Sequence, residues 1–235
     1  YAGTIRDYAG VGSGSLAVVN IGAGTQTFNG DSAYSGGTTI DAGRITAGHV
    51  NAFGKGMIAV NTNATAYFGA YNVTNAVTLN AGALYVGSGG ASGPISLNGG
   101  GFIRATGNYR TVSGPIRGSG GVAFDGGDSS AGITITSSLN DFTGDVSISG
   151  AYGDVARIIL GANEVIPDTA FVNITGGYLR ADSACIETIS GLNGDASATL
   201  FSPNASGWTV RIGYTNASSA FAGSMGAYWE TGWRG

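Results

Sequence analysis

The sequence predicts an all-β protein, a right-handed parallel β-helix (a solenoid) of about ten coils with almost no α-helix. Three observations lead to this prediction. Phrases recur at long and nearly constant distances, the composition is rich in glycine and poor in charge, and short alternating segments return at regular intervals. Repeats of this kind are typical of proteins that stack similar structural units along one axis.

The longest distances separate two phrases that each return about 110 residues later. Residues 2–6 (Ala-Gly-Thr-Ile-Arg) resemble residues 113–117 (Ser-Gly-Pro-Ile-Arg), and residues 222–225 begin the same phrase again. Residues 34–40 likewise resemble residues 142–148, at nearly the same distance. Repeats at a constant distance indicate that the chain is built from successive copies of one unit.

These repeats predict one continuous solenoid over residues 1–235. We expect two units of about 110 residues, roughly 1–111 and 112–220, followed by the start of a third at 221–235. The first residue falls inside a repeated phrase, so we expect a fragment or a processed product of a longer protein.

The composition excludes several other classes of protein. Glycine contributes 44 of 235 residues and charged residues only 10%, whereas hydrophobic residues reach 43%. The apolar fraction is too high for a disordered chain, and the abundant glycine, serine, threonine and asparagine disfavour helices. The formal net charge is −4 and the arginines are scattered singly, so we expect no nucleic-acid partner. We expect no membrane insertion, because polar residues and glycine interrupt every apolar run.

Short segments with apolar residues at alternate positions define the coil. Residues 77–80 (Val-Thr-Leu-Asn) return as residues 95–98 (Ile-Ser-Leu-Asn), and residues 58–61 (Ile-Ala-Val-Asn) precede the first copy by a similar distance. Alternation places the apolar side chains on one face of a strand. Asn-Gly and Asp-Gly hairpin signals are scarce, so successive coils are expected to stack in parallel, about 4.8 Å apart.

Parallel stacking predicts ladders of similar side chains through the interior. Two such ladders are expected: Val60–Leu79–Leu97 and Tyr67–Tyr85–Ile103. With about ten coils, the whole chain would form a rod of roughly 50 Å.

Few residues offer catalytic chemistry. His49 is the only histidine, and we expect it to be a solvated loop residue rather than a catalytic base. Cys185 is the only cysteine and is expected to be a small buried residue. We therefore predict no catalytic, cofactor-binding or metal-binding residues, and no cofactor.

An enzyme is the alternative, because parallel β-helices also serve as polysaccharide lyases and hydrolases. Such enzymes need carboxylates on one face of adjacent coils, often beside arginine or lysine. The candidate carboxylates are Asp125, Asp128, Asp141, Asp145 and Asp154. We interpret them as turn residues whose side chains cap backbone N–H groups, with a calcium clip as a further alternative.

Residues 34–45 (Tyr-Ser-Gly-Gly-Thr-Thr-Ile-Asp-Ala-Gly-Arg-Ile) resemble the autotransporter-associated β-strand repeat, as do residues 51–56, 160–168 and 212–223. The resemblance covers most of the chain. It implies a parallel β-helix from the exported passenger of a bacterial surface protein, extracellular or at the cell surface, such as an adhesin or a stalk. It transfers no catalytic residues.

The two ends of the chain share one phase of the repeat. Residues 1–4 match residues 221–224, Tyr8 falls level with Tyr228, and neither end shows a polar cap. We therefore predict that copies stack end to end, since a head-to-tail contact that does not close forms a filament. A piece of a long tandem passenger would show the same match in phase, so both interpretations stay open.

Six aromatic residues are predicted to contact a partner, either another copy or a host surface or glycan. They are Tyr1, Tyr8, Phe221, Tyr228, Trp229 and Trp233. The sequence as a whole predicts a non-enzymatic structural module, a rigid rod that serves as a fibre, a stalk or an adhesin passenger. The alternative is a β-helical polysaccharide lyase or hydrolase that acts through carboxylates on the solenoid face.

Overall fold

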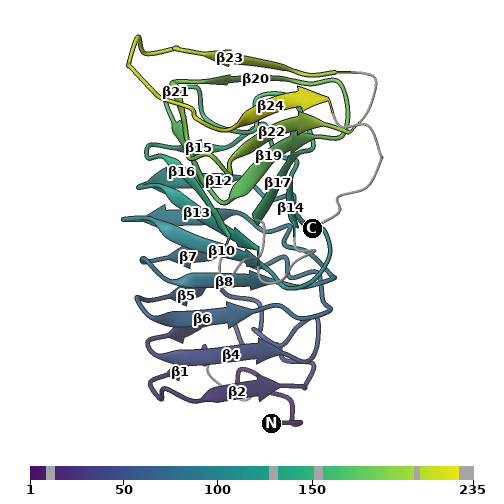
Figure 1. Cartoon of the computed structure of the whole chain (residues 1–235). Helices are drawn as coiled ribbons and strands as arrows, with labels where there is room; N and C mark the ends of the chain where they lie inside the picture. The colour runs from purple at the N-terminus through teal and green to yellow at the C-terminus, as the bar shows by residue number, and fades with distance from the viewer. Residues whose placement is uncertain (9–13, 127–131, 151–155, 204–206, 228–235) are drawn as a thin grey trace.

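The computed structural model describes residues 1–8, 14–126, 132–150, 156–203 and 207–227. These residues form one stack of β-strands, with the N-terminal coils at one end and the C-terminal coils at the other (Figure 1). All strand pairs among the described residues are parallel. The described residues include no helix. The predicted all-β parallel solenoid is thus confirmed.

Three long sheets form the walls of the solenoid. The seven-stranded sheet contains β1 (Val18–Asn20), β3 (Thr38–Ile40), β5 (Ile58–Val60), β7 (Val77–Leu79), β9 (Ile95–Asn98), β12 (Ile116–Ser119) and β15 (Asp141–Phe142). The nine-stranded sheet contains β2 (Thr25–Phe28), β4 (Gly43–Ala47), β6 (Ala64–Tyr67), β8 (Ala83–Val86), β10 (Gly101–Ala105), β13 (Val122–Gly126), β16 (Val146–Gly150), β18 (Phe171–Thr175) and β21 (Gly191–Gly194). Because each coil contributes one strand to the nine-stranded sheet, the solenoid has nine described coils, close to the ten expected.

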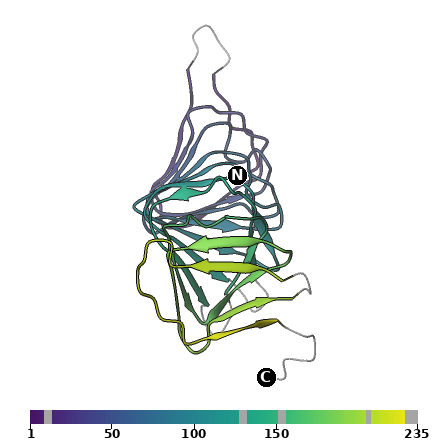
Figure 2. The same ribbon diagram turned by 90° about the horizontal axis from the view of Figure 1, so that it is seen from above.

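The third wall develops only in the second half of the chain. The six-stranded sheet contains β11 (Arg110–Val112), β14 (Gly132–Ile135), β17 (Ala156–Leu160), β19 (Gly177–Ala181), β22 (Thr199–Ser202) and β24 (Ser224–Ala227), and a two-stranded sheet pairs β20 (Ile186–Ile189) with β23 (Thr209–Ile212). The early coils close their third side with loops, in which the isolated bridges Val73–Ala91 and Ala91–Val112 pair neighbouring coils. Seen along the stack, the early coils overlie one another and the last coils lie to one side (Figure 2).

The register of the strands confirms the first predicted ladder. Val60 pairs with Leu79 and Leu79 with Leu97, and all three side chains are buried. The next wall carries its own interior ladder, in which each residue pairs with the following one: Ala66, Leu84, Ile103, Phe124 and Ile148. These side chains are also buried, so the core is a set of continuous apolar columns.

The second predicted ladder is wrong. Tyr67 does pair with Tyr85, but Tyr85 then pairs with Arg104, and Ile103 pairs with Leu84. Leu79 pairs with Leu97, and Ala83 pairs with Phe102. The chain takes four steps from Leu79 to Ala83 but five from Leu97 to Phe102, and this extra residue moves Ile103 to the level of Leu84. A shift of one residue exchanges the two faces of a strand, so Ile103 points inward whereas both tyrosines point outward.

Asparagine side chains form a hydrogen-bonded ladder along the corner that follows the seven-stranded sheet. The amide of Asn61 donates to Asp41 at 2.7 Å, Asn80 donates to Asn61 at 2.7 Å, and Asn98 donates to Asn80 at 2.9 Å. Each of these coils thus contributes one polar side chain at the same place. This polar ladder fixes the register of the corner as the apolar columns fix that of the core.

The two copies of the phrase that begins at residue 34 lie in different walls. Residues 38–40 form β3 of the seven-stranded sheet, whereas residues 146–150 form β16 of the nine-stranded sheet. The unit boundaries near residues 111 and 220 therefore stay a prediction. Among the described residues, no helix has the length and apolar character needed to cross a membrane.

Candidate functional site

The outward face of the nine-stranded sheet carries aromatic and arginine side chains in two neighbouring columns. One column runs Thr46–Tyr67–Tyr85–Arg104–Asp125 and the other runs Arg44–Thr65–Ala83–Phe102–Ala123. They occupy strands β4, β6, β8, β10 and β13, where every second residue points away from the core. We call the set formed by Arg44, Tyr67, Tyr85, Phe102 and Arg104 the arginine–aromatic surface.

The rings and guanidinium groups of this surface contact one another along the stack. The ring centroids of Tyr67 and Tyr85 are 6.5 Å apart, and those of Tyr85 and Phe102 are 6.4 Å apart. The Cζ atoms of Arg44 and Arg104 lie 5.0 and 5.1 Å from the centroid of Tyr85. A cation within about 6 Å of a ring centroid is attracted by the ring, so Tyr85 holds two guanidinium groups in place.

Short residues explain how Arg44 reaches a ring two coils away. Thr65 and Ala83 follow Arg44 in its column, so no bulky side chain blocks the path along the sheet. The Arg44 guanidinium also lies 5.9 Å from the Tyr67 centroid. The methylene stem of an arginine packs well along such a surface while its head group stays in water.

The two arginines differ in their charge partners. Arg104 donates from Nε to Asp125 Oδ2 at 3.0 Å, and its Nη2 contacts the same oxygen. Asp125 is only 4% exposed, and its Oδ1 is buried without a hydrogen-bond partner among the described residues. Arg44 makes no ion pair and no side-chain hydrogen bond within the described part of the chain. Arg104 is therefore neutralised and Arg44 is not.

A second aromatic and arginine group lies on the outward face of the six-stranded sheet. Arg157 and Arg180 each donate from Nη1 to the hydroxyl of Tyr109, at 3.4 and 3.3 Å. The rings of Tyr178 and Phe201 meet edge to face, with centroids 4.9 Å apart. Arg180 is paired with Asp182, and this partner raises the pKa of the Arg180 guanidinium.

A buried carboxyl lies in the upper coils. Glu187 in β20 is 0% exposed and accepts hydrogen bonds from the backbone N–H groups of Val165, at 3.0 Å, and Ile166, at 2.8 Å. Burial raises the pKa of Glu187 to about 8, and the nearby carboxyls of Glu164 and Asp168 also raise it. Cys185 is buried, as predicted, and burial beside Glu187 raises the pKa of its thiol.

The candidate carboxylates of the enzyme alternative do not converge within the described chain. Asp125 pairs in register with Ser149, which follows Asp145 by four residues. At about 3.3 Å per residue, the Cα atoms of Asp125 and Asp145 are roughly 13 Å apart along the strand direction. Glycosidic cleavage needs two carboxyls about 5 to 9.5 Å apart. Asp145 accepts a hydrogen bond from the backbone of Phe171, and Asp141 lies in the seven-stranded sheet. Asp128 and Asp154 lie outside the described residues.

His49 contacts two neighbouring polar residues. His49 accepts a hydrogen bond at Nδ1 from the backbone of Asn51 and lies 3.8 Å from Asp31. No group of three or more histidine, cysteine, aspartate or glutamate side chains capable of holding a metal ion occurs within the described ranges.

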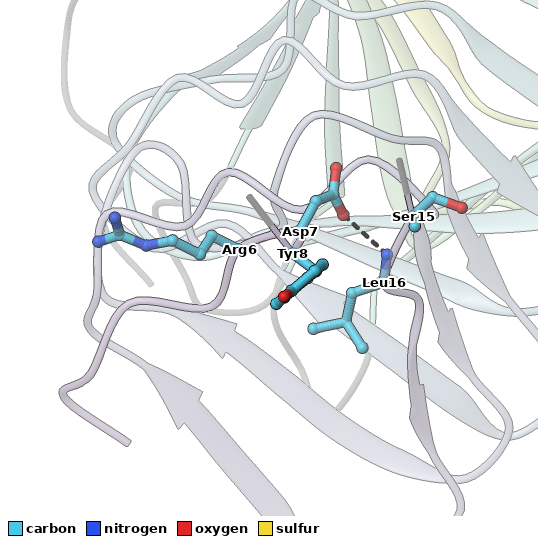
Figure 3. Close-up of a pocket in the computed structure, with 6 residues that line it drawn as sticks. Arg6, Asp7, Tyr8, Ser15 and Leu16 are labelled. Atoms are coloured by element: carbon cyan, nitrogen blue, oxygen red, sulfur yellow. Dashed lines mark hydrogen bonds between the residues drawn. The ribbon is translucent and has the colours of Figure 1, made fainter. Parts of the chain in front are cut away.

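A pocket near the N-terminus is lined by residues 6–8 and 14–16 (Figure 3). Asp7 accepts hydrogen bonds there from the backbone of Leu16, at 2.7 Å, and of Ser35, at 3.1 Å, which hold the pKa of its carboxyl below the usual value. Arg6 points away from the other labelled side chains in Figure 3. The carboxyl of Asp7 therefore ties the chain before the pocket to the chain after it.

The residues predicted to contact a partner lie in different surroundings. Tyr1 and Tyr8 are exposed, Tyr8 to 72%. Phe221 is half-buried against the core and forms a parallel bridge with Gly194. Tyr228, Trp229 and Trp233 lie outside the described residues. The structure thus does not bring these residues together as one described surface.

Sequence reasoning missed the arginine–aromatic surface. The signal was present, because Tyr67, Tyr85 and Arg104 follow one another at the spacing of the alternating segments. Tyrosine fits either face of a strand, since it combines an apolar ring with a polar hydroxyl. Only the pairing of Arg104 with Tyr85 reveals that the whole column points outward.

Comparisons with known proteins agree with this architecture. Residues 19–47 match the passenger-associated-transport-repeat family. The chain is also similar to the adhesin BmaC autotransporter of Brucella suis biovar 1 (strain 1330), with 28% identity over 217 residues. This match covers 88% of the chain but only 6% of that adhesin, so the chain spans a small part of its relative's length. No solved structure matches the chain. The repeat match over residues 19–47 and the similarity along most of the chain show that this protein resembles autotransporter passengers.

Proposed function

We propose that this chain is a non-enzymatic structural module of a bacterial surface protein, a rigid rod outside the cell whose outward faces contact adhesion partners. The observation that carries the proposal is the uninterrupted nine-stranded parallel sheet, which runs through all nine described coils. Eight spacings of about 4.8 Å separate the first strand of that sheet from the last, roughly 38 Å in all. Hydrogen bonds join each described coil to the next, and this makes the stack stiff.

The adhesive part of the proposal has two supports. The relative that matches most of the chain is named an adhesin. The outward walls also carry two groups of aromatic and arginine side chains, which are residue types enriched at binding hot spots. The spacing of Asp125 and Asp145 gives no support to the hydrolase alternative.

The proposal is tested with the purified chain, in solution and coated on beads. Small-angle scattering should give an elongated particle, and beads coated with the chain should attach to host-cell surfaces more than beads coated with albumin. Incubation with polygalacturonate should release no reducing ends. Release of reducing ends that disappears in the Asp125→Asn variant would overturn the non-enzymatic role.

End-to-end stacking of copies is the finer form of this proposal. Val19 and Ile21, at the outer edge of the first described coils, are 54% and 78% exposed. An open strand edge with apolar side chains favours pairing with a further coil. Analytical ultracentrifugation over a hundredfold range of concentration should show growing linear species, and a single monomeric species throughout would contradict stacking.

A further inference from the structure

We propose that the arginine–aromatic surface binds an acidic sugar, a pyranose ring that carries a carboxylate, with Arg44 as the group that pairs with this carboxylate. The inference rests on the proposed adhesive role and gives it a ligand class. Three features of the surface support it: the charge of Arg44, the neighbouring rings and the hydroxyls beside them.

Arg44 offers a positioned cation without a charge partner. Its guanidinium lies 5.0 Å from the Tyr85 centroid and 5.9 Å from the Tyr67 centroid, and it makes no ion pair with the described residues. Contact with the rings limits the freedom of the side chain, so less entropy is lost when a ligand binds. The guanidinium N–H groups match the two oxygens of a carboxylate. The surface is therefore complementary to one negative charge at this place.

Arg104 does not compete for that charge. The Nε and Nη2 groups of Arg104 both contact Oδ2 of Asp125, and Asp125 is almost fully buried. The pair is electrically neutral, so the surface carries a net single positive charge. A net charge of −4 for the whole chain disfavours a dense polyanion such as a nucleic acid and favours a ligand with few charges.

The rings on either side of Arg44 require an apolar face on the ligand. Tyr67, Tyr85 and Phe102 are half-buried residues of this outward face. A pyranose ring has a face of C–H groups that covers such an aromatic side chain and removes apolar area from water. An acidic peptide lacks this flat apolar face, which is why a sugar acid fits the surface better.

Hydroxyl groups beside the rings match the hydroxyls of a sugar. Thr65 lies between Arg44 and Ala83 in its column, and Thr46 lies next to Tyr67. The hydroxyl of Thr106 lies 3.5 Å from that of Tyr67 and donates to the Val86 carbonyl at 3.2 Å. Each of these hydroxyls has further capacity to donate or accept. One cation, three rings and three threonine hydroxyls together define a site for a charged, hydroxyl-rich and partly apolar ring.

The decisive experiment titrates the full chain with two matched sugars by calorimetry. The probes are the trisaccharide of galacturonic acid and its methyl ester, which has the same rings without the charge. The acid should bind at least about tenfold more tightly than the ester, because a charge-assisted pair to Arg44 is lost in the ester. Equal affinity for the two probes would overturn the assignment of Arg44.

Variants separate the charge from the rings. Arg44→Gln should reduce binding of the acid to the level of the ester and leave the ester unchanged. Phe102→Ala should weaken acid and ester by the same factor, because this ring contacts Arg104 rather than Arg44 and contributes without regard to the charge of the ligand. Arg117→Gln, on an exposed arginine of the seven-stranded sheet, is the matched control and should change neither. An equal loss in the Arg117→Gln variant would show non-specific attraction and overturn the site.

A peptide probe decides between ligand classes. A trimer of glutamate carries the same number of side-chain carboxylates as the sugar acid, and we expect it to bind at least about tenfold more weakly, because it lacks the apolar pyranose face. Peptide binding as tight as sugar binding, with the same loss in Arg44→Gln, would replace the sugar by an acidic protein partner. Circular dichroism of each variant checks that the fold is kept. Scattering and bead attachment test the rod and its adhesion independently, so failure of sugar binding alone leaves the proposed function standing.

Discussion

Glu187 gives the C-terminal coils a dependence on pH that is unusual for a carboxyl group. Its side chain is fully buried, and its pKa is raised to about 8 from an ordinary value of 4.5. The folded chain therefore keeps a proton that the unfolded chain releases above pH 4.5. Unfolding releases this proton, so the free energy of unfolding falls as pH rises from 4.5 and continues to fall until pH exceeds about 8.

We predict that raising the pH from 6 to 9 lowers the free energy of unfolding by about 2 to 3 kcal/mol through this group. Urea unfolding at the two pH values, followed by circular dichroism, measures the change. Glu187→Gln should remove most of the slope with pH, although its amide nitrogen cannot accept a backbone N–H and the variant is less stable at pH 6. A wild-type slope that persists in the variant would mean that another group carries the effect.

Gly43 occupies a backbone position that other residues adopt poorly. Its φ is +65°, and a Cβ built there would overlap the carbonyl oxygens of Gly22 and Gly24 in the neighbouring coil. Gly43→Ala is expected to cost about 2 kcal/mol or more, because both the strain and the overlap must be relieved. Gly22→Ala is the matched control, since nothing lies within 4 Å of its Cβ, and it should change stability by less than about 0.5 kcal/mol. Urea midpoints of the two variants test the difference.

At the scale of elements, corners hold the coils in register as much as strands do. Asn80 donates to Asn61 and accepts from Asn98, so it joins three successive coils. Replacing it breaks the ladder in the middle and leaves two amides without their partner. The sequence contains this pattern as an asparagine just after β5, just after β7 and at the end of β9.

We predict that Asn80→Ala lowers the free energy of unfolding by about 1 to 2 kcal/mol, through the two lost hydrogen bonds. Asn72→Ala changes an exposed asparagine of the same region and should have an effect below about 0.5 kcal/mol. Chemical denaturation measures both. Equal stability of the two variants would show that the hydrogen bonds between these side-chain amides do not stabilise the fold.

At the scale of the whole molecule, the stack should tolerate the loss of a whole coil but not of part of one. Deleting residues 62–80 would join Asn61 directly to Ala81. Asn61 would then take the position that Asn80 has in the full chain, and β5 would lead into β8. The interior ladders would then close over the gap, with β5 against β9 and β4 against β8. This follows from the additive character of solenoids, in which each coil contacts only its neighbours.

We predict that the chain without residues 62–80 folds and unfolds cooperatively, somewhat less stable than the full chain. Removal of residues 62–70 alone is the control. It leaves half a coil, so inward residues would face outward and the protein should fail to fold. Near-ultraviolet circular dichroism and scattering distinguish the two results, and a folded half-coil variant would contradict the strict phase of the stack.

Much of this architecture follows from the sequence alone. Segments that alternate apolar and polar residues and return at regular intervals have one simple way to bury all their apolar faces, which is to stack in parallel. The ladder of Val60, Leu79 and Leu97 and the burial of Cys185 follow from that pattern. The match of residues 19–47 to a passenger-associated repeat reflects the same pattern.

Only the tertiary structure decided which side chains meet on the outer walls and at the buried acid. One extra residue between Leu97 and Phe102 sets Arg104, rather than Ile103, beside Tyr85. Arg44 reaches Tyr85 because two short residues intervene in its column, and Glu187 is buried because residues 165 and 166 of another coil cover it. These contacts join residues on different coils, and the local alternation of a strand specifies its own two faces but not what the next coil places against them.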